Sequence, residues 1–146
     1  MLNISNQELQ HKMVVIRAEV KDPPSNTKKT EEWFFSFIKD LGMEVLLGPH
    51  VVYHPEIGNR GLTGIAGIKT SSITLHCWDE PDPAILMLDV YTCSSLDLEV
   101  VWKSLEIFSP IRLSYKYIDR DKDLVDIESK SMVDFISLHP LEKIAI

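Results

Sequence analysis

The sequence has few of the features that would set it apart from an ordinary globular domain. It contains only two cysteines, Cys77 and Cys93, which excludes a scaffold held together by several disulfides. No segment approaches the ~18 consecutive apolar residues that a membrane-spanning helix needs. Six glycines and eight prolines in 146 residues are too few for a collagen-like or low-complexity chain. Composition therefore predicts a single soluble domain over residues 1–146.

Positive charge is also scarce. Fifteen Lys and Arg stand against 22 Asp and Glu, for a formal net charge of -7, so the average surface field would repel a phosphate backbone. Residues 1–13 are mostly polar and lack the continuous apolar core of a secretion signal. We therefore expect a cytoplasmic protein with neither nucleic acid nor a membrane as a partner.

Familiar ligand-binding motifs are missing as well. Neither G-x-x-x-x-G-K nor G-x-G-x-x-G occurs, so nucleotide hydrolysis and dinucleotide binding have no support. His50 and His54 would share a metal only on a helix, and they fall in a β-like run that ends at Pro55. We expect no metal site.

Apolar periodicity predicts an α+β fold. The β-like runs are residues 13–20, 43–53, 62–69, 72–78, 85–93 and 112–118. One helix is expected from an N-cap within residues 25–30 to Leu41, with Trp33, Phe34 and Phe37 as core residues, and another from a Ser94 or Ser95 cap to about Ser109. This order predicts a mainly antiparallel sheet with two helices packed on one face, in two layers.

Two segments carry a more specific pattern. Residues 61–80 read Gly-Leu-Thr-Gly-Ile-Ala-Gly-Ile-Lys-Thr-Ser-Ser-Ile-Thr-Leu-His-Cys-Trp-Asp-Glu, and residues 88–93 read Leu-Asp-Val-Tyr-Thr-Cys. They resemble the prokaryotic S-adenosylmethionine decarboxylases, whose pattern is approximately G-V-T-G, E-S-H-I-S-I-H-T-W-P-E and V-D-V-F-T-C. A fainter likeness covers residues 13–120, the family-like core, and residues 121–146 form a C-terminal extension of unassigned role.

The resemblance implies a proenzyme that cleaves itself between Thr70 and Ser71 and converts Ser71 into a pyruvoyl group. The Ser71 hydroxyl would attack the Thr70 carbonyl to give an ester, and loss of the α-proton would then release the new N-terminus. By motif position, His76 is the processing base, because an imidazole suits proton abstraction near neutrality. Thr63 matches the hydroxyl residue that assists the rearrangement.

The same resemblance implies decarboxylation through a Schiff base between substrate and pyruvoyl group, as in spermidine and other polyamine biosynthesis. Cys93 matches the residue that returns a proton to the α-carbon. Tyr53 and Glu80 are weak candidates for contacts with substrate. The family is homodimeric, with sites between subunits, and a second copy would also cover the sheet face that two helices leave open.

Several positions depart from the family pattern. Thr70 replaces glutamate, Ser72 replaces histidine and Asp79 replaces proline, while residues 57–61 lack the usual aromatic segment. Two alternatives therefore stay open: an uncleaved, non-enzymatic homologue, and a pyruvoyl-dependent decarboxylase of another amino acid such as arginine or ornithine. Residues five apart on a strand face opposite ways, so Ser71 and His76 share a site only if the chain bends near residues 70–72.

Overall fold

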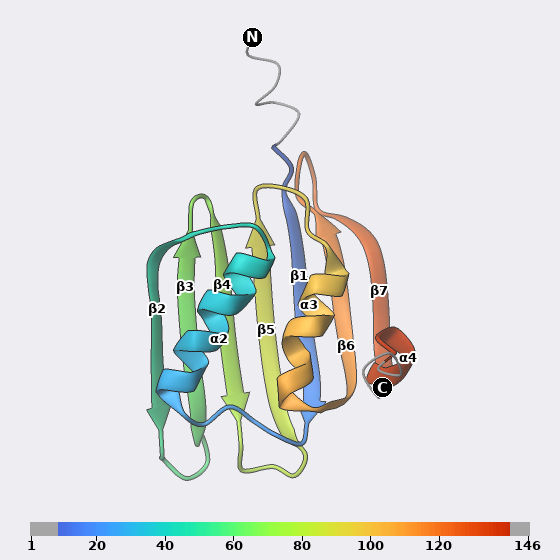
Figure 1. The fold of residues 1–146 in the computed structure, drawn as a ribbon. Helices are drawn as coiled ribbons and strands as arrows, with labels where there is room; N and C mark the ends of the chain where they lie inside the picture. Colours follow the sequence, from blue (N-terminus) through green and yellow to red (C-terminus); the bar gives the residue numbers. More distant parts are fainter. Residues whose placement is uncertain (1–8, 141–146) are drawn as a thin grey trace.

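The computed structural model describes residues 9–140. Seven strands form one sheet in the order β2-β3-β4-β5-β1-β6-β7, and every neighbouring pair is antiparallel. The helices α2 (Thr27–Asp40) and α3 (Leu98–Leu105) both lie across the same face of this sheet (Figure 1). The predicted α+β fold, with two helices on one face, is therefore confirmed.

Six of the strands match the predicted runs to within two residues at each end. They are β1 (Lys12–Val20), β2 (Val45–His54), β3 (Gly61–Ile68), β4 (Ser71–Trp78), β5 (Ala84–Thr92) and β6 (Pro110–Asp119). The C-terminal extension adds two elements that the sequence did not predict, the strand β7 (Val125–Asp134) and the short helix α4 (Phe135–Leu138). It therefore widens the sheet beyond β6.

The caps of the two long helices were predicted with unequal success. Asn26 begins α2 by accepting the Lys29 amide hydrogen, as a cap within residues 25–30 should. The cap of α3 is Asp97, which accepts from the Glu99 amide, so the prediction of Ser94 or Ser95 was wrong. Ser94 lies too early because its carbonyl accepts the Thr92 hydroxyl, which holds the chain in a bend before the helix.

The core lies between the sheet and the two helices. Alternate residues of β1, β4 and β5 are buried there, and Trp33, Phe34 and Phe37 of α2 pack onto them as predicted. The other side chains of these strands lie on the opposite face, which we call the open face; it carries Val15, Arg17, Thr74, His76, Met87 and Asp89. The open face is the side of the sheet that α2 and α3 do not cover.

The C-terminal extension is tied to the helix side of the fold. Phe135 of α4 is 2% exposed, and the His139 ring lies between two carboxylates, with Nδ1 3.3 Å from Glu99 Oε1 and Nε2 against Glu106. These contacts join residues 135–139 to α3 and to the 3-10 turn η1 (Glu106–Phe108). None of the described helices has the length and apolar character to span a membrane.

Candidate active site

The predicted cleavage position lies in the tight turn between β3 and β4. Ile68 pairs with Ser71, so Lys69 and Thr70 alone connect the two strands. Thr70 has a φ of 57°, a left-handed conformation that is unusual for a β-branched residue. The bond between Thr70 and Ser71 therefore joins a strained turn residue to the first residue of a regular strand.

Ser71 and Cys93 meet at this end of the sheet, the upper end in Figure 1, where β4 begins and β5 ends. The Cys93 amide donates to Ser71 Oγ over 3.0 Å. Thr70 Oγ1 lies 2.9 Å from Cys93 Sγ and 2.6 Å from the Lys69 carbonyl oxygen. We call Lys69, Thr70, Ser71 and Cys93 the Ser71–Cys93 cluster.

The surroundings of Cys93 favour its thiolate. The hydrogen bond from the Thr70 hydroxyl lowers the pKa of the Cys93 thiol, against a smaller opposing effect of partial burial, and the Ser71 hydroxyl acts in the same direction as Thr70. Cys77 behaves in the opposite way, because burial raises its pKa to about 12. Both cysteines are free thiols, and only Cys93 has the environment of a reactive one.

Thr63 and His76 form a second pair, on the open face. They are direct partners in the β3–β4 ladder, and Thr63 Oγ1 lies 3.0 Å from His76 Nδ1. The Trp78 ring follows on the same face, 6.2 Å from the His76 ring, and its Nε1 donates to Asn59 Oδ1. Together these residues border a hollow of about 230 Å³.

Within one chain the Ser71–Cys93 cluster and the Thr63–His76 pair are separate. Ser71 is buried on the helix side whereas His76 is on the open face, and five residues of strand span about 16 Å. The pairing of β4 with β3 runs without a register shift from Ser71 to Trp78, so the turn at Thr70 does not bend the strand toward His76. Ser71 and His76 of one chain therefore do not share a site, because the bend that this would need near residues 70–72 is absent.

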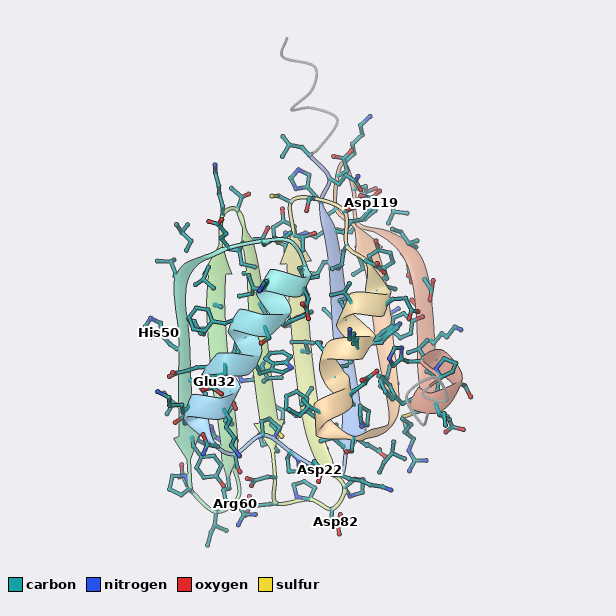
Figure 2. The ribbon with its side chains drawn as sticks, viewed as in Figure 1. Asp22, Glu32, His50, Arg60, Asp82 and Asp119 are labelled. Carbon is teal, nitrogen blue, oxygen red and sulfur yellow. The ribbon has the colours of Figure 1, made fainter. Side chains whose placement is uncertain are left out.

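Residues 57–61 and Asp79, which depart from the family pattern, lie at the other end of the sheet, where Figure 2 shows Arg60. Arg60 Nε lies 2.6 Å from Asp79 Oδ1, and the Tyr53 hydroxyl donates to Asp79 Oδ2 over 2.8 Å. Burial disfavours ionisation of Asp79, but the hydrogen bonds from Arg60 and Tyr53 outweigh it and lower the pKa of the carboxyl. Arg60 of this loop and Tyr53 of β2 therefore both stabilise the ionised form of Asp79.

Tyr53 and Glu80, the two weak substrate-binding candidates, both belong to this loop network. The Tyr53 hydroxyl is held by Asp79. The Glu80 carboxylate accepts from the backbone amides of Gly58 and Arg60. Both side chains therefore hold the β2–β3 loop against the end of β4.

Two glycines of the motif are explained by packing. A Cβ on Gly61 would lie 1.8 Å from the Cys77 carbonyl oxygen, and one on Gly64 would lie 2.6 Å from Cε2 of the fully buried Phe34. Both distances are shorter than any real carbon contact. These glycines let β3 approach β4 and α2 closely, which fixes Thr63 opposite His76.

Two residues near Cys93 were missed from the sequence. Tyr91 lies on β5 two residues before Cys93, and its hydroxyl is 2.8 Å from Nδ1 of His11, which precedes β1. The Tyr91 position was visible inside the V-D-V-F-T-C likeness, where the family pattern has phenylalanine. His11 carried no signal, because its partner is 80 residues away.

Comparisons with known proteins identify the family and the fold. The model of the S-adenosylmethionine decarboxylase family matches residues 17–121, well over half of the chain. A solved structure of an adenosylmethionine decarboxylase from Aquifex aeolicus is similar with a TM-score of 0.56 and 18% sequence identity, over 85% of this chain and 98% of that one. A search of curated proteins found no match. The chain belongs to the S-adenosylmethionine decarboxylase family.

Proposed function

We propose that the protein is a self-processing, pyruvoyl-dependent S-adenosylmethionine decarboxylase that serves spermidine synthesis. The observation that carries this proposal is the contact between Ser71 Oγ and the Cys93 amide. It puts the expected cleavage residue and the expected proton donor side by side, although they are 22 residues apart in sequence. Family membership makes decarboxylation the first reaction to test.

Cleavage would begin at the strained turn. Ser71 Oγ attacks the Thr70 carbonyl carbon, the C–N bond between the two residues breaks, and an ester with a free Ser71 amine results. Removal of the Ser71 α-proton then expels the Thr70 carboxylate and leaves a dehydroalanine, which takes up water and releases ammonia to give the pyruvoyl group. The left-handed conformation of Thr70 assists the first step, because its strain of ~1–2 kcal/mol is present before cleavage.

The residues around Ser71 suit a pyruvoyl group. Such a group supplies an electron sink for the loss of CO2 from an amino acid. Ser71 is 7% exposed and lies beside Cys93. Cys93 returns the proton to the α-carbon, and its lowered thiol pKa brings the thiol and thiolate forms closer to balance near neutrality.

We further propose that the processing histidine comes from a second copy of the chain. His76 lies on the open face and cannot reach Ser71 of its own chain without disrupting β4. In a homodimer joined through the open faces, the partner subunit's His76 would have to reach Ser71 around the end of β4, past Thr70 and Cys93, because Ser71 faces the helix side. Such a dimer would also cover the half-exposed apolar side chains of that face, among them Met87 and Ile65.

Intact-mass measurement tests the central step. The purified chain should convert from 16.7 kDa into two fragments, residues 1–70 and 71–146. Ser71→Ala should stay whole and folded. Cys93→Ala should be cleaved but should release less CO2 from S-adenosylmethionine, or inactivate itself by misprotonation. Release of CO2 from arginine or ornithine instead would point to the other amino-acid substrates.

Co-expression tests the shared site. His76→Gln alone should remain uncleaved. In a mixed dimer of one His76→Gln chain and one Ser71→Ala chain, the His76→Gln chain should be cleaved, because the Ser71→Ala chain retains the histidine. Light scattering should report a dimer at micromolar concentration. Absence of cleavage in the mixed dimer, or a monomeric mass, would contradict the shared site.

A second function is supported by two observations. Ser71 and His76 are apart within a chain, and Thr70 stands in place of the family's glutamate, so the chain is also suited to remain an uncleaved homologue that binds a ligand without turnover. A wild-type protein that stays at 16.7 kDa after prolonged incubation would favour this function.

A further inference from the structure

The start of β1 and the end of β5 are joined by a side-chain contact on the open face. The His11 and Tyr91 rings are stacked, with centroids 6.2 Å apart and planes inclined by 9°. His11 Nδ1 and the Tyr91 hydroxyl are hydrogen-bonded over 2.8 Å. The Arg120 guanidinium caps the Tyr91 ring, 4.4 Å from its centroid, and the Arg120 amide donates to the His11 carbonyl over 2.7 Å.

This contact borders the backbone of Cys93. The Gln10 amide donates to the Cys93 carbonyl over 2.9 Å, and the Cys93 amide donates to Ser71. Gln10 precedes β1 and Cys93 follows β5, so both lie outside the regular ladder, where strands fray most easily. Beyond their last ladder pair, Lys12 with Thr92, the two ends are joined by this backbone bond and by the bond between the His11 and Tyr91 side chains.

We propose that His11 and Tyr91 are positioning residues for Cys93. They act through the backbone: the pair fixes Gln10 against the Cys93 carbonyl, and this keeps the thiol next to Thr70 and Ser71. The consequence for decarboxylation rests on the proposed function, because the returned proton must come from a thiol at one fixed place. The effect of the pair on the position of the Cys93 thiol does not depend on any reaction.

The charged groups around the cluster are few. Lys69 lies in the turn beside Cys93, Arg120 stacks on Tyr91, and Lys12 at the start of β1 pairs with Asp119 at the end of β6 over 3.7 Å. The neutral contacts of the cysteine are with Thr70, whose hydroxyl donates to Sγ, and with Ser71, whose Oγ accepts from the Cys93 amide. Loss of the Thr70 contact would raise the pKa of the Cys93 thiol, since that hydrogen bond is the largest cause of its lowering.

The rate at which iodoacetamide alkylates Cys93 tests the proposal, followed from pH 6 to 10 by peptide mass. Cys77 is buried and its pKa is about 12, so it serves as the unreactive internal reference. In Tyr91→Phe and His11→Ala we expect the pH midpoint to move upward and the limiting rate at high pH to rise at least threefold. His11→Asn, whose amide can replace Nδ1 as a partner, should restore the wild-type profile.

Tyr115→Phe is the matched control. It also loses one hydroxyl hydrogen bond, to Glu128, but on β6 and away from Cys93. Wild-type midpoint and rate in both Tyr91→Phe and His11→Ala would overturn the proposal, as would an equal change in Tyr115→Phe. Alkylation is measured on the uncleaved chain, in a Ser71→Ala background if the wild type cleaves itself, so that Thr70 keeps its contact with Cys93. A chain that never cleaves but shows the shifted profiles would therefore refute the proposed function and leave the positioning role standing.

Discussion

Relief of backbone strain at Thr70 should slow self-cleavage. Thr70 has a φ of 57°, and a left-handed conformation costs an L-residue roughly 1–2 kcal/mol. Glycine adopts this conformation without that cost. If the strain is released once the Thr70–Ser71 bond is no longer a planar amide, Thr70→Gly loses that contribution to the rate, and cleavage should slow by about 5- to 30-fold.

The thermal stability of Thr70→Gly should change little. The relieved strain is offset by the greater backbone entropy of glycine, ~0.5–1 kcal/mol, and by loss of the hydroxyl that contacts Cys93 Sγ. The assay follows the appearance of the fragment that starts at residue 71 by mass spectrometry, beside the melting temperature. A changed rate at constant melting temperature would therefore report on the turn itself.

Two further variants separate strain from other effects. Thr70→Asn retains a polar side chain and tolerates the left-handed conformation, so it should slow cleavage as well. Lys69→Gly changes the other turn residue, which does not have a positive φ, and should be cleaved at close to the wild-type rate. Cleavage of both Thr70 variants at the wild-type rate would refute the role of strain.

Three other predictions concern stability. Gly64→Ala should cost about 1–3 kcal/mol in urea unfolding because its Cβ meets the buried Phe34, whereas Gly67→Ala, which faces the exposed Leu47, should cost clearly less. Asp79→Asn should make the free energy of unfolding less sensitive to acid. Folding lowers the pKa of Asp79, so the ionised carboxyl stabilises the fold above the ordinary carboxyl range near 4, and this stabilisation is lost as pH falls through the folded pKa. Equal acid sensitivity of the wild type and Asp79→Asn would contradict this. His139→Ala should speed amide exchange in residues 125–138, because Glu99 and Glu106 lose their shared partner, and unchanged exchange there would count against the contact.

The sequence predicted the parts of this fold that bury apolar residues. Six strands and two helices show period-two or helical apolar patterns, and each was found close to its expected bounds. β7 has almost only exposed side chains, so no burial pattern marked it. Its formation depends on hydrogen bonds to the edge of β6, which a linear pattern does not encode.

The candidate site, too, was predicted only in part from the sequence. Motif positions indicated Thr63, Ser71, His76 and Cys93, and the structure has two contacts among them, Thr63–His76 and Ser71–Cys93; the catalytic roles of these residues stay predictions. The contacts of Arg60 with Asp79 and of His11 with Tyr91 join residues 19 and 80 positions apart. Their partners become apparent only once the strands are placed in register.

The pairing of Arg60 with Asp79 makes the two positions unequal in their tolerance of substitution. The Arg60 side chain is 41% exposed and that of Asp79 is 11% exposed. An arginine at position 60 is tolerated alone because solvent screens it, whereas a carboxylate at position 79 without its partner is a poorly solvated charge that costs stability. Replacement of Arg60 alone should therefore cost more stability than replacement of Asp79 alone, although both changes break the same contact.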